Sequence, residues 1–288
     1  MPEGDSVYRA ASALHRSLVG QVLVRTDFRV PRLATADLSG RSVLETVPRG
    51  KHILVRVSPG AEPGSPALTL HSHLMMDGRW DVLGRLADGS RPRWRRPAHT
   101  ARAILETDRC QAVGFAIQQV VLVPTAQEDQ LVGHLGPDLL APQWSQPMRD
   151  EAVRRLLLRP QRPIATALMD QSVLAGIGNI YRNELLFLHR LAPETPVDQV
   201  GDLPGLVEDA HRLLLLNRDR GIRVTTGDPR RGRQLGVYSR DRRACLRCGT
   251  MLIRRSWDDA EAEHDPRTGL RPPARERPLY TCPRCQSG

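Results

Sequence analysis

Residues 168–190 read LMDQSVLAGIGNIYRNELLFLHR, and the triplet Gly176-Ile177-Gly178 divides this stretch into two apolar halves. Residues 168–175 predict a short first helix, and Asn179 opens a second helix that continues to Leu188. Glycines on both sides of the isoleucine let another molecule approach the backbone, and the amides at a helix N-terminus attract anions. The stretch therefore predicts two helices that meet at a phosphate-binding turn, although an ordinary helix connection has the same pattern.

The first 124 residues predict one helix followed by short β-strands. Asp5 is a good N-cap for a helix that ends at Gly20, because apolar residues recur on one face of the stretch between them. The apolar pattern then changes from helical spacing to alternation, with Gly, Pro, Ser and Asp clusters between the alternating runs. Eight such runs predict a β-sandwich or barrel. The runs are residues 22–24, 43–47, 52–57, 67–70, 80–83, 101–106, 113–117 and 120–123.

The middle of the chain predicts a second, helical domain. Residues 125–147 are polar and rich in turn-forming residues, which predicts a hinge after the domain formed by residues 1–124. Helical spacing of apolar residues then returns, and we assign residues 148–235 to a domain of their own. Within it the sequence predicts helices at 151–158, at 203–217 and on both sides of the glycine turn.

Two C-x-x-C pairs lie in the last predicted domain, residues 236–288. Cys245 and Cys248 form the first pair, Cys282 and Cys285 form the second, and 33 residues separate them. Paired knuckles of this kind predict a four-cysteine zinc site, and a redox-active pair is the weaker alternative. We therefore expect one structural Zn²⁺ ion bound by all four thiolates.

The spacing between the two pairs exceeds the usual roughly 15–20 residues. We assign the excess to an insertion at 258–276, which is rich in Asp, Glu, Pro and Arg and contains His264 as a non-ligand. Zinc would fold the flanking residues 251–254 and 279–280 into a β-hairpin. The predicted fold class is thus α+β: an N-terminal helix with an eight-stranded β-sandwich, a helical domain and a zinc-finger β-hairpin.

The chain carries a formal net charge of +10 and has a pI of about 10.3. Between residues 212 and 255 there are 13 Arg against three Asp, so the surplus of positive charge is concentrated there. Such a surplus predicts a nucleic-acid partner, with an anionic membrane surface as the competing interpretation. The sequence has no apolar run near 18 residues and no signal segment at its start, so we expect no membrane insertion and a cytoplasmic, nucleoid-associated protein.

Three residues suggest covalent chemistry. Removal of the initiator Met would leave Pro2 as a free secondary amine, which attacks electrophilic carbon, and Glu3 could move protons beside it. An idle, frayed terminus is the bland alternative. Lys51 is the one lysine among 42 Lys and Arg residues, and it follows Arg49-Gly50 in a predicted tight turn at the start of a strand. Because guanidinium does not readily lose a proton, a retained lysine suggests a need for an ammonium group, although chance is the alternative.

Residues 71–78, HSHLMMDG, follow a predicted strand and predict a loop. His71 and His73 have a spacing seen in metal sites, but no third ligand lies nearby, so we interpret them as strand-end or phosphate-contacting histidines. The two adjacent methionines fit either core packing or insertion into a DNA base stack.

Taken together, Pro2-Glu3, Lys51, the G-I-G-N turn at 176–179 and a four-cysteine tail that contains Arg277 resemble the formamidopyrimidine-DNA glycosylase and endonuclease VIII family. The resemblance covers essentially the whole chain, in family order. It implies that Pro2 attacks C1′ of a damaged nucleotide and that Glu3 assists opening of the sugar ring. It also implies that Lys51 contacts phosphate and aids elimination.

The resemblance also implies a set of DNA contacts. Asn179 corresponds to the phosphate-binding residue of the family's helix-two-turn-helix, and Arg277 to the finger arginine that grips phosphates around the flipped nucleotide. Tyr238 resembles the tyrosine near the DNA backbone. His73 corresponds to the histidine of the H-L-x-M loop, with Met76 as the residue that wedges into the duplex.

The implied function is that of a bifunctional DNA glycosylase and abasic-site lyase of base excision repair, acting as a monomer. The opening MPEGD and the short loop at 217–235 favour the endonuclease VIII branch and oxidised pyrimidines as substrates. An oxidised-purine glycosylase and a non-catalytic DNA-binding relative are the alternatives. The family's void-filling arginine and phenylalanine are not clearly present at 108–114, so we expect a weak dependence on the opposite base and action on bubbles or single strands as well as duplexes.

Overall fold

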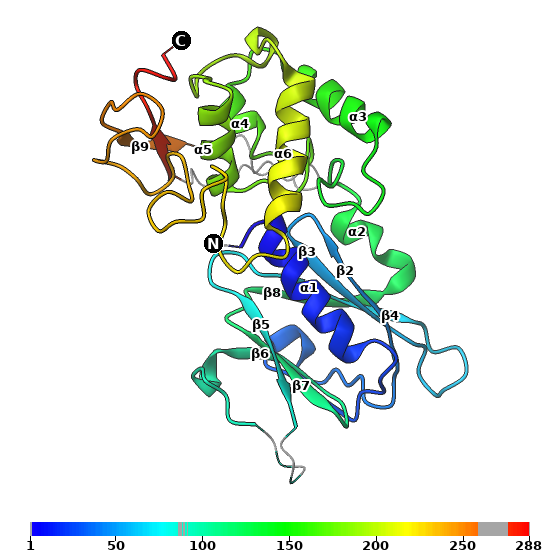
Figure 1. Ribbon diagram of the computed structural model, residues 1–288. Coiled ribbons are helices and arrows are strands. Elements are labelled where there is room, and N and C mark those ends of the chain that lie inside the picture. Colours follow the sequence, from blue (N-terminus) through cyan, green and yellow to red (C-terminus); the bar gives the residue numbers. More distant parts are fainter. Residues whose placement is uncertain (1, 86–87, 89, 91, 259–275, 288) are drawn as a thin grey trace. The chain divides into compact units, whose positions relative to one another are not determined.

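The chain divides into two units between His134 and Leu135 (Figure 1). The computed structural model describes residues 2–85, 88, 90, 92–258 and 276–287. In this part of the chain no helix is both long and apolar enough to cross a lipid bilayer. The four-part division predicted from the sequence, with its hinge at 125–147, stays a prediction.

Helix α1, Gly4–Leu18, opens the first unit. Its apolar face packs into the core, and the side chains of Val7, Ala11 and Leu14 are fully buried. The predicted N-cap was wrong by two residues, because Glu3 takes that position and Asp5 lies buried in the first turn. The Ser6 hydroxyl explains the shift, since it accepts the Glu3 N–H at 2.9 Å and so begins the helix earlier.

Two antiparallel four-stranded sheets form the rest of the first unit and enclose its apolar core together with α1. The strand orders are β1-β6-β7-β5 and β2-β3-β4-β8, which confirms the predicted eight-stranded sandwich. Alternation along β3 places Ile53 and Val55 in this core and leaves His52 and Arg56 on the opposite face. The strands are β1 Arg25–Phe28, β2 Val43–Arg49, β3 His52–Val57, β4 Leu68–His73, β5 Arg79–Gly84, β6 Ala101–Glu106, β7 Cys110–Phe115 and β8 Gln119–Pro124.

The first predicted strand, 22–24, was wrong. Val22 forms an isolated bridge with Ser42, and the ladder begins at Arg25, which pairs with Glu106 of β6. The side chain of Leu23 is buried and its two neighbours are exposed, so the alternation is real. It reflects the burial of a single side chain and not pairing with a neighbouring strand.

Two further boundaries differ from the prediction. β7 begins at Cys110 and not at 113, because the Thr107 N–H donates to the Cys110 carbonyl at 2.9 Å and closes a tight turn there. Residues 71–73 were predicted as loop but belong to β4, because His71 pairs with Leu54 of β3 and with Val121 of β8. Polar side chains on a sheet face outside the core concealed this strand end.

The second unit contains helices α3 Gln146–Leu157, α4 Ile164–Ala167, α5 Asn179–Leu188 and α6 Leu203–Asn217. The predicted helices at 179–188 and 203–217 are confirmed. The short α2, Asp129–Val132, lies at the end of the first unit. Among the described residues, four 3-10 turns complete the helical elements, at Pro31–Leu33, Ala98–Thr100, Thr125–Gln127 and Val197–Gln199.

The predicted helix at 168–175 was wrong, because the helix before the glycine turn is α4 and residues 168–175 form turns. Pro163 is the N-cap of α4. The Asp170 carboxylate then accepts the Ser172 N–H at 2.9 Å, a local bond that competes with helix continuation. α3 also begins earlier than the predicted 151, because Pro147 suits a first turn.

A two-stranded hairpin, β9 Ile253–Asp258 and β10 Glu276–Thr281, lies in the C-terminal part of the second unit. Its register pairs Thr281 with Ile253 and Arg277 with Trp257. The hairpin agrees with the predicted zinc-finger β-ribbon. Of the predicted insertion at 258–276, residues 259–275, and with them His264, lie outside the described residues.

Candidate functional site

Pro2 and Glu3 lie directly before α1, and the first turn of this helix holds them. Glu3 is completely buried, and its carbonyl oxygen accepts the N–H groups of Ser6 and Val7, both at 3.0 Å. Pro2 is half-buried. A terminus that is hydrogen-bonded into an ordered helix is not frayed. The Pro2 nitrogen therefore has a defined position, and the next residue, Glu3, carries a carboxyl group.

Lys51 occupies the predicted tight turn, between β2 and β3. Arg49 and His52 pair across the two strands, so Gly50 and Lys51 form a two-residue hairpin loop. Gly50 has φ 57°, a left-handed conformation that glycine adopts without strain. The Lys51 side chain is half-buried at the start of β3.

The sheet face outside the core carries a cluster of four histidines, His52, His71, His73 and His134, called here the histidine cluster. The His52 ring stacks on His71 with 5.0 Å between centroids, and its edge contacts His73 at 4.6 Å and His134 at 6.3 Å. His52 and His134 thus lie near the two predicted histidines, but the described residues contain no group of metal ligands at this place. Register brings His52 opposite His73, and sequence separation hid this contact.

Burial and mutual repulsion keep the centre of this cluster neutral. Burial, followed by repulsion from His73, lowers the pKa of His52 well below its ordinary value. Burial also lowers the pKa of His71 to about 4, although the Glu128 carboxylate opposes this shift. Both rings are thus uncharged at neutral pH.

This neutrality predicts a loss of stability in acid. The pKa of His71 is about 4 in the folded chain and near 6.5 when unfolded, so the unfolded chain binds more protons between these values. The contribution of His71 to the free energy of unfolding is fully present above pH 6.5. It decreases by about 3 kcal/mol as the pH drops toward 4. Urea denaturation over this range measures it. His71→Gln cannot titrate and should show a shallower pH slope, so equal slopes would refute the assignment.

Met76 lies in the turn after β4 and its side chain is 46% exposed. Leu74, two residues before it, is buried in the core of the first unit. The turn therefore has one anchored side chain and one that faces solvent, as a wedge requires.

The turn at 176–179 is closed by Gln171. Its side chain accepts the Gly176 N–H at 3.1 Å and donates to the Ile177 carbonyl at 3.0 Å. Gly176 has φ 117°, which side-chain-bearing residues rarely adopt, and Gly178 is the N-cap of α5. The sequence did not indicate this role of Gln171.

Asn179 is fully buried and connects α5 to the hairpin. Its Nδ2 donates to the Pro278 carbonyl at 2.9 Å, and its Oδ1 accepts Arg182 Nη2 at 2.5 Å. Asn183 continues the attachment, because its Oδ1 accepts the Tyr280 N–H at 2.6 Å. The structure thus brings Asn179 next to the strand that carries Arg277, which is half-buried.

Arg182 and Asn183 were missed by the sequence reasoning. Both are fully buried polar residues in a helix that also buries Asn179 and Glu184. Buried polar groups are nearly always hydrogen-bonded, so their presence between apolar residues was a usable signal for an attached partner.

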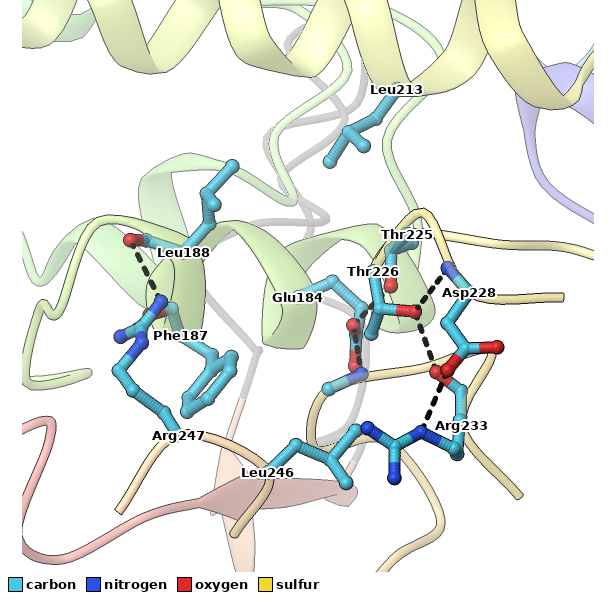
Figure 2. A pocket seen from close by; sticks show the side chains of 11 residues that line it. Glu184, Phe187, Leu188, Leu213, Thr225, Thr226, Asp228, Arg233, Leu246 and Arg247 are labelled. Carbon is cyan, nitrogen blue, oxygen red and sulfur yellow. Dashed lines mark hydrogen bonds and ion pairs between the residues drawn. The ribbon is translucent and has the colours of Figure 1, made fainter. Parts of the chain in front are cut away.

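Glu184 positions Tyr238, and Figure 2 shows Glu184 together with the residues of the pocket beside it. Its carboxylate accepts the N–H groups of Gly236 at 2.6 Å, Val237 at 2.9 Å and Tyr238 at 2.8 Å, and also the Thr225 hydroxyl. The Tyr238 ring then packs on Tyr280 of β10 in an edge contact, with 5.1 Å between centroids. Beside this carboxylate lies a pocket of about 380 Å³, lined by Glu184, Phe187, Leu188, Leu213, Thr225, Thr226, Asp228, Arg233, Gly236, Leu246 and Arg247.

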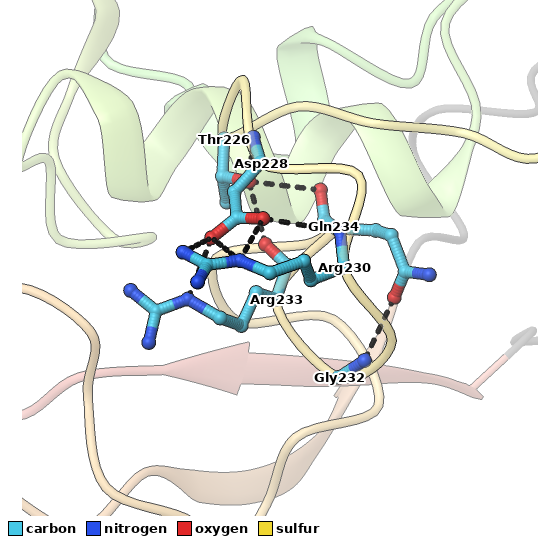
Figure 3. Close-up of polar contacts among 6 residues, drawn as sticks. All are labelled: Thr226, Asp228, Arg230, Gly232, Arg233 and Gln234. Atoms are coloured by element: carbon cyan, nitrogen blue, oxygen red, sulfur yellow. Dashed lines mark hydrogen bonds and ion pairs between the residues drawn. The ribbon is translucent and has the colours of Figure 1, made fainter.

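Asp228 stabilises the basic loop that precedes Tyr238 (Figure 3). Its carboxylate accepts Arg230 Nη2 and Arg233 Nε, both at 2.7 Å, and the bonds from Arg230 lower the pKa of Asp228. The Thr225 N–H donates to the Gln234 carbonyl at 2.8 Å and closes the loop at its base. The loop is therefore compact and presents guanidinium groups at the surface.

The four cysteines lie together. Their sulfur atoms are all within 4.8 Å of one another, and Cys248 Sγ and Cys282 Sγ are 3.5 Å apart. Tetrahedral Zn–S bonds of about 2.3 Å place ligand sulfurs roughly 3.8 Å apart, so the donor set fits a metal ion of this type. Within the described residues no other group of three or more potential ligands meets the same distance criterion.

Comparison with known families agrees with this arrangement. Residues 1–119 match the formamidopyrimidine-DNA glycosylase N-terminal domain, and residues 135–212 match the formamidopyrimidine-DNA glycosylase H2TH domain. A probable endonuclease 8 2 of Streptomyces coelicolor is 47% identical over 100% of this chain and 95% of its own length. The chain belongs to the formamidopyrimidine-DNA glycosylase and endonuclease VIII family.

Other members of this family are similar over the same length. Endonuclease 8 2 of Mycobacterium tuberculosis is 42% identical over 99% of this chain and all of its own. The DNA-(apurinic or apyrimidinic site) lyase Nei2 of Mycolicibacterium smegmatis is 39% identical, with 100% and 99% of the two chains covered.

Solved structures of the family share the fold. MutM in complex with DNA containing carbocyclic 8-oxo-G superposes with a TM-score of 0.73 at 22% identity. Lactococcus lactis Fpg in complex with DNA containing an abasic site superposes with a TM-score of 0.72 at 21% identity. Each match covers the whole of both chains.

Proposed function

We propose that this protein is a bifunctional DNA glycosylase and abasic-site lyase that removes oxidised pyrimidines during base excision repair. The observation that carries the proposal is Pro2, a secondary amine once Met1 is removed, held by α1 next to the fully buried Glu3. Membership of the family supports it, and so does sequence similarity over the full length to chains named endonuclease 8.

The proposed reaction begins with the flipped nucleotide. The Pro2 nitrogen forms a bond to C1′ while the glycosidic bond breaks, and the base leaves with the electron pair and with the proton that the Pro2 nitrogen gives up. Glu3 donates a proton to O4′ as the C1′–O4′ bond opens, which leaves an iminium between Pro2 and C1′. Loss of a proton from C2′ then expels the 3′ phosphate by β-elimination and cuts the strand, and δ-elimination can follow.

The other predicted residues bind DNA in this proposal. Lys51 contacts a phosphate and aids the elimination, and Met76 wedges into the stack where the base has left, with His73 beside it. Asn179 and Arg277 bind phosphates on the second unit, and Tyr238 lies along the backbone. Because Asn179 Nδ2 already donates one hydrogen to Pro278, its second hydrogen and the helix N-terminus are what a phosphate would meet.

Zinc belongs to the proposal as a structural ion. Cys245, Cys248, Cys282 and Cys285 would hold it, and it would supply folding energy to the hairpin that carries Arg277. No step of the reaction involves the metal.

The choice of substrate rests on two short loops. The loop before Tyr238 is closed at its base by the Thr225–Gln234 bond, so it lacks a long lesion-capping segment. Thr107, Asp108 and Arg109 alone join β6 to β7 in a tight turn, which leaves little chain to fill the space opposite the lesion. These features favour oxidised pyrimidines, weak dependence on the opposite base, and cleavage of single strands and bubbles by a monomer.

A substrate panel tests the proposal. Dihydrouracil and thymine glycol are expected to be excised at least about 10-fold faster than 8-oxoguanine, and at similar rates opposite each of the four bases. The same lesions in single strands should also be cut. Preference for 8-oxoguanine would place the protein with purine-specific enzymes, and strict opposite-base dependence would contradict the loop argument. Binding without cleavage of any substrate would make it a non-catalytic relative.

A further inference from the structure

His73 ends β4 and accepts a hydrogen bond at Nδ1 from the backbone N–H of Met75, at 3.1 Å. A side-chain acceptor bonded to the N–H two residues further on is the arrangement of an Asx turn, in which an Asn or Asp oxygen usually has this role. An imidazole nitrogen accepts only when it carries no proton. The bond therefore requires neutral His73 with its hydrogen on Nε2.

Met75 needs this support because its backbone is left-handed, with φ 52°. Such a conformation is unfavourable for a residue with a side chain, and something in the surroundings must hold it. A second bond, from the Gly78 N–H to the Leu74 carbonyl at 2.8 Å, closes the same turn. A Cβ at Gly78 would lie 2.4 Å from that carbonyl oxygen, so the turn is tightly packed at its far end. The exposed Met76 is thus held from both sides.

The surroundings of His73 decide when it stays neutral. His52 lies in edge contact with His73, and burial together with repulsion from His73 lowers the pKa of His52. His71 Nε2 lies 2.7 Å from His52 Nδ1, and His71 Nδ1 is buried without a hydrogen-bond partner among the described residues. The charged and titratable groups that face the cluster are Lys51 from the β2–β3 turn, His52 and Arg56 from β3, His71 from β4, Glu128 before α2, and His134.

We propose that His73 is the positioning residue of the wedge: its neutral imidazole holds the Met75 turn in the conformation that presents Met76 to the DNA, and protonation of His73 releases that turn. The inference rests on the proposed function, which assigns Met76 to the base stack. Protonated His73 carries a hydrogen on both ring nitrogens and cannot accept the Met75 N–H. The turn therefore loses this hydrogen bond. Duplex substrates need the wedge, whereas a lesion in a single strand does not have to be extruded from a duplex.

Two variants of the full chain show whether the hydrogen-bond acceptor of His73 or its imidazole ring is required. The Asn side chain places an oxygen near the position of the histidine Nδ1, whereas the Gln amide reaches the position of Nε2. We compare His73→Asn and His73→Gln with the wild type for excision of dihydrouracil from a duplex and from a single strand, so that both substrates undergo the same chemistry. His73→Gln should lower the ratio of duplex to single-strand kcat/KM about 10- to 100-fold, because a small misplacement of a positioned group has effects of this size. His73→Asn should stay within about threefold of the wild type.

The pH profile gives an independent readout. The wild-type ratio of duplex to single-strand activity should fall as the pH is lowered from about 7 to about 5, where histidines become charged. The ratio for His73→Asn should stay flat, because an amide does not titrate. Changes in the protonation of Pro2 or Glu3 affect both substrates and cancel in the ratio. Combining His73→Gln with Met76→Ala should give no further loss beyond Met76→Ala, since both act on one element.

Equal losses in His73→Asn and His73→Gln would overturn the inference, because the ring itself would then be required. An unchanged ratio in His73→Gln, or parallel pH profiles for the wild type and His73→Asn, would overturn it as well. In each of these cases the wild type remains active and the proposed function stands. A wild type that is inactive on both substrates would overturn the proposed function together with the inference.

Discussion

A chain that carries an uncleaved residue before Pro2 is expected to lose borohydride trapping on a duplex with one abasic site by at least about 1,000-fold. An added residue converts the Pro2 nitrogen into an amide, whose lone pair is delocalised into the carbonyl, so no iminium can form. The wild-type chain should form one covalent adduct per molecule. Gel separation of the trapped complex measures the loss.

The chain itself supplies a sharp control for this experiment. Lys51 is the only lysine in the sequence, so peptide mass assigns a trapped adduct either to the amine of the first residue or to Lys51. Pro2→Gly keeps a primary terminal amine and should retain part of the trapping. If the blocked chain is trapped as efficiently as the wild type and the adduct lies on Lys51, the proline mechanism is wrong.

Cys282→Ser is expected to remove bound zinc and to weaken DNA binding by at least about 100-fold. Structural zinc contributes roughly 10 kcal/mol or more to the folding of small finger modules, so the hairpin should lose its register without it. β10 would then no longer hold Arg277 next to Asn179, and a phosphate-binding group would be lost. Zinc content by mass spectrometry and affinity for an abasic-site duplex measure the two effects.

Cys110→Ser is the matched control. Cys110 is buried in the first unit, and its thiol faces the Ser17 carbonyl at 3.5 Å, a contact that a hydroxyl can also make. This variant should keep one zinc per chain and bind DNA within about threefold of the wild type. Cys282→Ser with full zinc content, or without zinc but with unchanged affinity, would contradict the proposed role of the four cysteines.

Local patterns predicted most of the elements. The helices at 179–188 and 203–217 follow from apolar periodicity, and strands β2 to β8 follow from alternation between turn residues. The errors lie where one side chain changes a local bond. Ser6 begins α1 two residues early, and Asp170 prevents a helix after α4. Bonds of this kind depend on rotamers, which periodicity does not describe.

Sequence by itself determined the chemistry available to this protein. A proline behind the initiator Met, a single lysine in a tight turn, two C-x-x-C pairs and a glycine turn before Asn179 are covalent and local features, which do not depend on the rest of the fold. Together these features also indicated the family and the finger, whereas the alternating apolar runs indicated the sandwich.

Only the tertiary structure decided which polar residues meet. Strand register places His52 opposite His73, and chain folding adds His71 and His134 to a cluster whose pKa values depend on burial. Likewise the attachment of α5 to β10 joins Asn179 to Pro278, 99 residues further along the chain. Contacts between distant segments and the dielectric around them are properties of the packed chain, so no local pattern in the sequence reports them.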